Sequence, residues 1–338
     1  MSNRVERWKQ FLKFLDPYRG VLALLAVFIL GIVASPYDLA GRNVFLKSDV
    51  QWALLRMVAE YGILAAGMTL VILTGGIDLS VGSVLGMSGM VFSHLLIVAE
   101  WSAPAALAVG VLAGGAMGAV NGVLISRFGM QPFVATLASM VAARGLAKWV
   151  SDSKKIMTEL ELLPNGVAVR KVPEMFEVLG GRVGSSPVFV VTLIMVSVMV
   201  LGWWLLRKTM YGRSLYAIGG NEEAAKLSGL RVALNKTIAY ALCGGLAGLA
   251  GVLHACQAKQ GDPDAGSMYE LDAIAAVVIG GTTLTGGRGG MILTLIGVLI
   301  IGYIDTVLSI NNVQYPKRLV IKGTIIVIAV LIQQRRRH

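Results

Sequence analysis

Residues 54–98 read LLRMVAEYGILAAGMTLVILTGGIDLSVGSVLGMSGMVFSHLLIV. Two apolar runs, 54–74 and 80–98, lie on either side of a short string that carries a carboxylate, hydroxyls and glycines. A helix rises about 1.5 Å per residue, so roughly 20 apolar residues are enough to cross the hydrocarbon core of a bilayer. This stretch therefore predicts two membrane-spanning helices with almost no loop between them.

Similar apolar runs follow one another along almost the whole chain. We expect about ten spans, near 20–36, 54–74, 80–98, 104–126, 132–150, 188–206, 237–257, 271–283, 290–310 and 319–333. The composition agrees, because only 14% of the residues are charged, whereas a soluble domain carries about a quarter. The expected fold is an all-α, polytopic membrane helical bundle.

Basic residues indicate how this bundle is oriented. The net charge is +11, and the basic residues gather before the first span, after the last span and in the loop 207–236. Basic residues near span ends are typical of the cytoplasmic side, so we expect both termini and this loop there. The other long loop, 151–187, balances basic with acidic residues and is expected to be periplasmic. The pattern favours membrane topology over nucleic-acid binding, although Lys317 and Arg318 are left on the outer side.

The chain is expected to form one membrane domain. We assign residues 20–333 to it, with a cytoplasmic amphipathic arm at 1–19 and a basic cytoplasmic tail at 334–338. In the arm, apolar and basic residues alternate, which is typical of a short helix on a membrane surface. The first apolar run lacks an Ala-x-Ala cleavage site and does not resemble a secretory signal. Cys243 and Cys256 fall in one span and are expected to be small buried side chains.

Glycines occur in two arrangements that predict different roles. Within spans they recur three or four residues apart, at Gly110, Gly114, Gly115, Gly118, Gly122, Gly244, Gly245, Gly248 and Gly251. Such spacing lets helix backbones approach closely in lipid. Glycine pairs, in contrast, break helices. One pair belongs to the string LTGG, which occurs at 73–76 and again at 284–287, and both copies are expected to face the same side of the membrane.

The first functional candidate is the polar string between the two opening spans. Its members are Thr74, Gly75, Gly76, Asp78, Ser80 and Gly82. Irregular backbone near membrane depth is tolerated only where protein or a water-filled cavity covers it. Asp78 lies where a helix restarts, so its carboxylate can cap free N–H groups at the positive helix end. A direct part in translocation or gating, and ion or proton coupling, are the alternatives.

The second candidate is the sequence YAIGGNEEAAKLSGL, residues 216–230, within the cytoplasmic loop. It predicts a short capped helix with Asn221 as the N-cap, acidic residues in the first turn and Gly229 in the left-handed closing position. The residues concerned are Gly220, Asn221, Glu222, Glu223, Ala224, Ala225, Lys226 and Gly229. A rigid helix that faces the cytosol suggests docking to a partner, and a helix that merely links two spans is the alternative.

These two segments, with YELDAIAAVVIGGTTLTGGRG at 269–289, closely resemble the permease subunits of bacterial ATP-binding-cassette (ABC) sugar importers. The nearest in pattern are the ribose-type permeases, whose branch also serves xylose, arabinose, galactose, rhamnose and autoinducer-2. The resemblance runs from about residue 54 to 330 in the same order. The charged loop 151–187 and the basic N-terminal arm depart from the ribose-type pattern.

The resemblance implies a multi-pass permease of the bacterial inner membrane that translocates a monosaccharide. It implies three kinds of partner: cytoplasmic ATPase subunits, a periplasmic sugar-binding protein and a second permease copy, identical or related. The segment 220–229 matches the family's coupling helix, which rests in a groove of the ATPase. The binding protein would release sugar into a cavity between the two permease copies.

Charged residues elsewhere in the spans have simpler interpretations. Arg56 and Glu60 are four residues apart and can neutralise each other on one helical face. Arg144 and Lys148 share this spacing and can snorkel towards the outer surface or line a vestibule. Three polar residues are each expected to make single hydrogen bonds within the bundle: Asn121, His254 and Asp305.

Glu270 and Asp272 begin the span 271–283 from the outside and are candidates for the periplasmic side. They are expected to complement a helix N-terminus, with contact to the binding protein or the pathway as the alternative. The glycine-rich stretch 280–290 lacks the Gly-Lys-Ser/Thr ending of a phosphate-binding loop. The sequence also has no metal-ligand spacing and no serine–histidine–acid set, so we expect no catalytic, metal or cofactor site. An ion-coupled secondary transporter using Asp78, or a passive facilitator, is the competing hypothesis.

Overall fold

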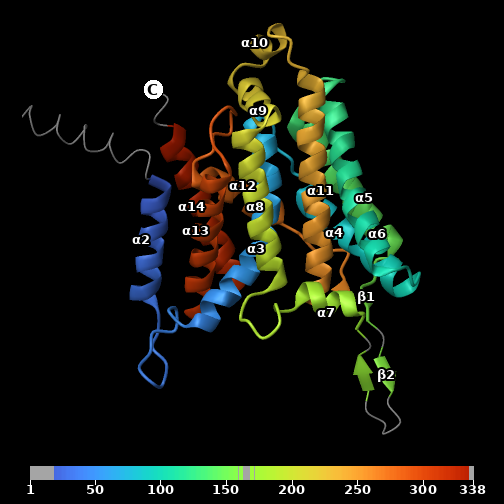
Figure 1. The fold of residues 1–338 in the computed structure, drawn as a ribbon. Coiled ribbons are helices and arrows are strands. Elements are labelled where there is room, and N and C mark those ends of the chain that lie inside the picture. The colour runs from blue at the N-terminus through green and yellow to red at the C-terminus, as the bar shows by residue number, and fades with distance from the viewer. Residues whose placement is uncertain (1–18, 159, 163–167, 171, 335–338) are drawn as a thin grey trace, which may run out of the picture.

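The computed structural model describes residues 19–158, 160–162, 168–170 and 172–334. The expected arm at 1–19 and the tail at 334–338 lie outside the described residues, except for their innermost residues. Long helices run roughly side by side, and small two-stranded ribbons lie at one end of the bundle (Figure 1).

The helices are α2 Arg19–Ala34, α3 Ser48–Leu73, α4 Val81–Ser93 continued by the π-helix η2 His94–Val98, α5 Ala103–Ser126, α6 Pro132–Val150, α7 Glu174–Gly180, α8 Val190–Lys208, α9 Met210–Gly220, α10 Glu222–Leu227, α11 Val232–Ala258, α12 Tyr269–Gly280, α13 Met291–Ile310 and α14 Tyr315–Gln334. The strands are β1 Ile156–Met157, β2 Leu160–Leu162, β3 Ala168–Arg170 and β4 Gln260–Gly261. β1 pairs with β4 and β2 pairs with β3, both antiparallel.

Seven helices in the described part of the chain are long and apolar enough to cross a membrane. They are α3, α4 with η2, α5, α6, α8, α11 and α13. Every predicted span falls on a helix, but the expected number of about ten exceeds these seven. In particular, α12 has 12 residues, so at about 1.5 Å per residue it is too short to cross the hydrocarbon core. The segment predicted as the span 271–283 is therefore a half-length helix.

Helix α11 lies at the centre of the bundle and packs against α3, α4 and α5. The spaced glycines bring α5 and α11 into backbone contact, as predicted. A Cβ built on Gly114 would lie 2.8 Å from Gly248 Cα, and one built on Gly244 would lie 2.9 Å from Gly118 Cα. Larger side chains at these positions would push the two helices apart.

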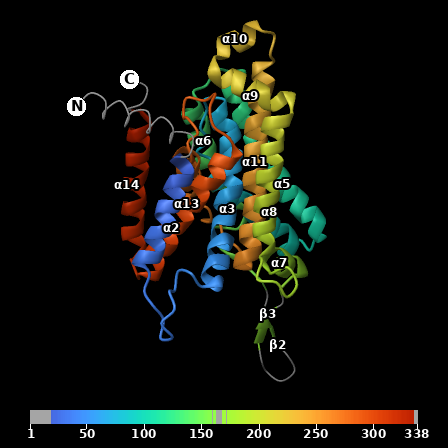
Figure 2. The same ribbon diagram turned by 60° about the vertical axis from the view of Figure 1, so that its left-hand side comes forward.

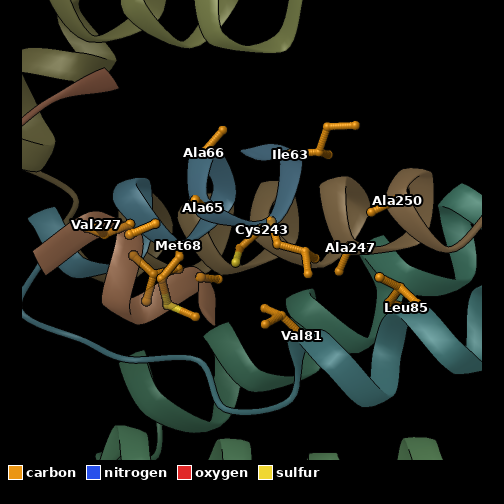
Figure 3. Packing of buried hydrophobic residues seen from close by; sticks show 14 of the residues in the cluster. Ile63, Ala65, Ala66, Met68, Val81, Leu85, Cys243, Ala247, Ala250 and Val277 are labelled. Carbon is orange, nitrogen blue, oxygen red and sulfur yellow. The ribbon is translucent and has the colours of Figure 1, made fainter. Parts of the chain in front are cut away.

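The apolar core continues from this contact into α3, α4 and α12. Met68 of α3, Val81 and Leu85 of α4 and Val277 of α12 belong to one cluster with the α11 residues Cys243, Ala247 and Ala250 (Figure 3). Cys243 and Cys256 are both buried and free, as the sequence predicts.

The bundle has two distinct ends (Figures 1 and 2). At one, which we call the α10 end, α9 and α10 lie with the start of α2 and the C-terminal end of α14. At the other, the hairpin end, lie β1, β2, β3 and α7. Exposed tryptophans lie near both ends of the bundle. Trp203 and Trp204 are in the last turns of α8, near the α10 end, and Trp101 and Trp149 lie towards the hairpin end. Two such belts are typical of membrane–water interfaces.

Candidate functional site

Helix α10 has the caps that its sequence predicts. The Ala224 N–H donates to Asn221 Oδ1 at 3.0 Å, which is the N-cap hydrogen bond. At the other end Gly229 has φ +81°, and its N–H donates to the Lys226 carbonyl at 3.0 Å. Both ends of this six-residue helix are therefore fixed by local hydrogen bonds.

Almost all of α10 is exposed at the α10 end of the bundle (Figure 1). Within it only Ala225 is buried, and Leu227 is 88% exposed. An ion pair of 2.5 Å joins Glu222 to Lys236 in the first turns of α11. Helix α10 thus projects from the bundle with both of its ends fixed. It presents the carboxylates of Glu222 and Glu223 and the apolar side chain of Leu227.

Helix α9, which directly precedes α10, was not predicted from the sequence. Thr209 caps it by accepting a hydrogen bond from the Gly212 N–H at 3.1 Å, and Leu215 and Ile218 are buried. Two features of the sequence could have indicated α9: the N-cap residue Thr209 and the helical spacing of Tyr211, Leu215 and Ile218. The expected loop 207–236 is mostly helical as a result.

The glycine pairs of three segments meet at the end of α9. The Gly287 N–H donates to the Leu73 carbonyl at 3.0 Å. A Cβ built on Gly219 would overlap both the Leu73 oxygen and the Gly287 nitrogen, and one built on Gly286 would lie 2.7 Å from the Gly75 nitrogen. The two LTGG strings therefore lie at the same end, as predicted, and α9 packs between them. We call these five residues the glycine junction.

Asp78 follows this junction and organises the start of α4. It is 1% exposed, and its Oδ1 accepts hydrogen bonds from the Ser80 N–H at 2.9 Å and the Ser80 hydroxyl at 2.5 Å. Asn121 of α5 donates to the Ser80 hydroxyl at 3.0 Å and accepts from Ser139 of α6. Asp78 therefore orders the backbone before α4 through its hydrogen bonds with Ser80, the N-cap residue, although no side chain caps α4 itself. Asn121, expected to make a single hydrogen bond, connects this segment to two other helices.

The second carboxylate oxygen of Asp78 is different. Asp78 Oδ2 and the hydroxyl of Tyr240 on α11 are buried, and neither has a hydrogen-bond partner among the described residues. Asp78 is close enough to act electrostatically on Tyr240, and a Cβ built on Gly76 would overlap the Tyr240 hydroxyl. Most buried polar groups are hydrogen-bonded, so an acceptor and a donor left unused in one place are an exception.

The far end of the polar string contacts the segment 262–268, which leads into α12. A Cβ built on Gly82 would overlap both the Gly266 carbonyl oxygen and the Glu270 carboxylate. The structure therefore brings together one residue of the string and one periplasmic-side candidate. Glu270 lies at the beginning of the half-length helix and faces α4.

Arg144 of α6 holds this segment in place. Its Nη1 donates to the carbonyl oxygens of Pro263 at 2.6 Å and Ala265 at 2.8 Å. Arg144 thus fastens a loop rather than snorkelling, and Lys148 forms an ion pair with Asp264 at 3.0 Å. The prediction missed these contacts because it placed both side chains on the outside of an isolated span.

Asp262 strengthens the same attachment at the hairpin end. It forms a 2.8 Å ion pair with Lys155, beside the β1–β4 pairing. Partial burial raises the pKa of Asp262, but the hydrogen bonds from Lys155 and from the Asp264 N–H outweigh it, so the pKa is lowered. The Asp262 carboxylate is therefore ionised at neutral pH.

Asp272, the other periplasmic-side candidate, belongs to a separate charged triad. Lys322 of α14 lies 3.2 Å from Asp272 and 2.6 Å from Asp305 of α13. The prediction of a single hydrogen bond for Asp305 is therefore wrong. Asp272 lines two narrow crevices, neither with room for more than about one water molecule, and Tyr61 borders the second. A lysine inside a predicted span was the available signal for this triad.

The predicted pair of Arg56 and Glu60 on α3 is also wrong. Glu60 instead lies 2.8 Å from His254 Nδ1 and accepts a hydrogen bond from Gln257, both on α11. Arg56 donates to Gln257 Oε1 at 2.7 Å. The face of α3 that carries these charges packs on α11, so the neighbouring helix supplies the partners. No group of His, Cys, Asp or Glu suited to a metal ion occurs among the described residues.

Comparison with known proteins gives consistent results along the chain. The family model described as "Branched-chain amino acid transport system / permease component" matches residues 52–330. The ribose import permease protein of Bacillus subtilis (strain 168) is 42% identical over 322 residues, 95% of this chain and 93% of that protein. The ribose import permease protein of Escherichia coli (strain K12) is 37% identical over 94% of each chain. An L-arabinose ABC transporter permease protein of Azospirillum brasilense is 38% identical over 94% of this chain and 87% of that protein. No solved structure matches.

Proposed function

Because this chain belongs to the family of branched-chain amino acid transport system permease components, we infer that it is the membrane-spanning permease subunit of an ABC sugar importer. The observation that carries this function is the similarity to sugar permeases over more than nine tenths of the chain. The apolar helices agree with a multi-pass protein of the bacterial inner membrane. Separate ATPase subunits supply the energy.

The cargo is a monosaccharide, and ribose is the first candidate to test. Two of the relatives are named for ribose import and a third for L-arabinose transport. A soluble binding protein selects the sugar and delivers it at the hairpin end, where β1, β2, β3 and α7 lie (Figure 1). Uptake of labelled ribose, with L-arabinose as competitor, measures this preference directly.

Helix α10 is the surface on which the ATPase docks. Three observations support this: it projects from the bundle, its two ends are capped, and Leu227 is exposed. The pair between Glu222 and Lys236 leaves Glu223 as the carboxylate directed at a partner. Because α10 is already ordered before it binds, docking loses little conformational entropy, which favours a stable contact.

The polar string 74–82 and the two acidic residues of α12 belong to the gate and the pathway. Asp78 lies in the core between α4, α5 and α6, while Glu270 contacts Gly82. Asp272 borders two narrow crevices beside its triad, so charged hydrogen-bonding groups lie at the surface where we place the pathway. A second permease copy completes the pathway in this proposal, so that the sugar passes between the two copies.

Co-purification tests the assignment. The chain, produced in its native membrane with the ATPase encoded beside its gene, is expected to purify as a complex that hydrolyses ATP faster when sugar-loaded binding protein is added. A chain that purifies without an ATPase and takes up sugar on its own would contradict the assignment. The ion-coupled alternative predicts that second result, together with collapse of uptake by an uncoupler.

A further inference from the structure

We propose that the glycine junction transmits movement of α10 to the Asp78 segment, with Gly219 as its positioning residue. The inference rests on the proposed function, because it requires an ATPase that moves α10. It goes further by assigning a path through named backbone contacts from the docking helix to the segment that leads into α12.

The first step lies between α10 and the junction. Only Asn221 separates the end of α9 from the start of α10, so a displacement of α10 pulls on Gly219. Helix α9 is also attached to the 281–290 loop, because the Tyr216 hydroxyl donates to the Gly289 carbonyl at 2.9 Å. The two elements therefore move together.

The second step lies within the junction, where backbone touches backbone. Gly219 lies against Leu73 and Gly287, and Gly287 donates to the Leu73 carbonyl at 3.0 Å. Flexible side chains can absorb a small displacement by changing rotamer, whereas contacting backbone atoms cannot. A shift at Gly219 is therefore passed to Leu73 and Gly75, where α3 ends and the polar string begins.

A second connection reaches the same segment through α11. Glu222 pairs with Lys236, and Tyr240 follows one turn later on the same face of α11. The Tyr240 hydroxyl lies against Gly76. The N-terminal end of α10 is thus linked to the polar string by two routes, through α9 and through α11.

The third step provides two alternative arrangements of the segment. In this structure the Tyr240 hydroxyl, which lies against Gly76, and Asp78 Oδ2 are both buried and have no partners among the described residues. When the string moves, Tyr240 donates a hydrogen bond to Asp78 Oδ2, which compensates the contacts that the movement breaks. A switch needs two states that differ by only a few kcal/mol. The hydrogen bond between Tyr240 and Asp78 stabilises the second state, because it pairs two groups that are unpaired in the first.

The last step reaches the opposite side of the bundle. Gly82 lies against Gly266 and Glu270, and a Cβ built on Gly86 would lie 2.7 Å from the Ala265 oxygen. A movement of the start of α4 therefore displaces the segment 262–268 and the beginning of α12. The docking helix at one end is connected in this way to Glu270 inside the bundle.

The chain offers a matched pair of substitutions as a test. A Cβ on Gly219 overlaps backbone atoms, whereas a Cβ on the adjacent Gly220 has nothing within 4 Å. In proteoliposomes with ATPase and binding protein, Gly219→Ala is expected to keep the ATPase bound and hydrolysing while sugar transported per ATP falls at least tenfold. Gly220→Ala is expected to keep the wild-type ratio. Equal ratios for the two variants would overturn the proposal.

A second variant decides the matter if Gly219→Ala does not accumulate. Tyr240→Phe removes a hydroxyl that makes no hydrogen bond in this structure, so thermal stability and ATPase binding are expected to stay unchanged. Sugar transported per ATP is expected to fall, because the second arrangement loses its bond. A wild-type ratio in this variant would contradict the transmission path. Failure of the wild-type protein itself to bind an ATPase would instead contradict the proposed function.

Discussion

At the scale of single residues, the two oxygens of Asp78 have different roles. Oδ1 accepts two hydrogen bonds from Ser80 and so orders the start of α4, while Oδ2 has no partner among the described residues. Capping and gating, which the sequence leaves as alternatives, can therefore coexist in one carboxyl group.

Substitution of Asp78 is expected to separate these roles. Asp78→Asn keeps an Oδ1 acceptor, so its melting temperature in lipid is expected near that of the wild type. ATP-driven uptake is expected to fall, because the amide can only donate to the Tyr240 oxygen and this neutral bond is weaker than one from Tyr240 to a carboxylate. Asp78→Ala leaves the Ser80 donors unpaired and is expected to cost about 1–3 kcal/mol. Normal uptake by Asp78→Asn would restrict the residue to capping.

The triad of α12, α13 and α14 gives a second prediction at this scale. Lys322→Met leaves Asp272 and Asp305 close together without their cation, so a loss of about 3 kcal/mol is expected, read as a lower melting temperature. The triple variant that adds Asp272→Asn and Asp305→Asn removes the repulsion and is expected to recover most of the loss. Equal melting temperatures for the single variant and the wild type would show that the triad adds no stability.

At the scale of elements, α10 presents Glu223 to the solvent at the α10 end. Glu223→Arg reverses a charge on the proposed docking surface and is expected to abolish co-purification of the ATPase. Its local cost to helix stability is only about 0.3–1 kcal/mol. Glu174→Arg is the matched control, because Glu174 is exposed in the first turn of the short helix α7 at the opposite end. Loss of ATPase in both variants, or in neither, would contradict docking through α10.

Elements with strong local signals were predictable. The apolar runs locate the long helices because a membrane span needs length and hydropathy, and Asn221 and Gly229 locate the caps of α10 because caps depend on neighbouring residues. Helix α9 was missed because its Thr209 cap follows a span with almost no break. The apolar run at 271–283 is short in the sequence, but it was counted as a span, because an apolar run does not reveal whether its helix crosses the membrane.

Contacts between helices were not predictable from one sequence. Spacing indicates which residues share a helical face, but not which neighbour that face meets. Glu60 therefore pairs with His254 rather than with Arg56, and Asp272 with Lys322. The repeated LTGG string indicated a common side of the membrane, but its contact with Gly219 follows from the packing of three segments.

At the scale of the whole molecule, we expect the α10 end to face the cytoplasm and the hairpin end to face the periplasm. Its free cysteines are buried, so they react poorly and leave a low background. In cells that lack the ATPase, which would cover α10, a cysteine in place of the exposed Leu227 is expected to react with a membrane-impermeant maleimide only after the inner membrane is opened. One in place of the exposed Val178 is expected to react from outside. Labelling of Leu227→Cys in intact spheroplasts would reverse the orientation.

The central claim is that ATP hydrolysis by a partner drives sugar through this chain. The most direct measurement is uptake of labelled ribose into proteoliposomes that contain the chain, its ATPase and loaded binding protein, with ATP inside or with a proton gradient alone. The account predicts uptake that requires ATP and the ATPase and is unaffected by an uncoupler. Uptake that follows the proton gradient without the ATPase would contradict it.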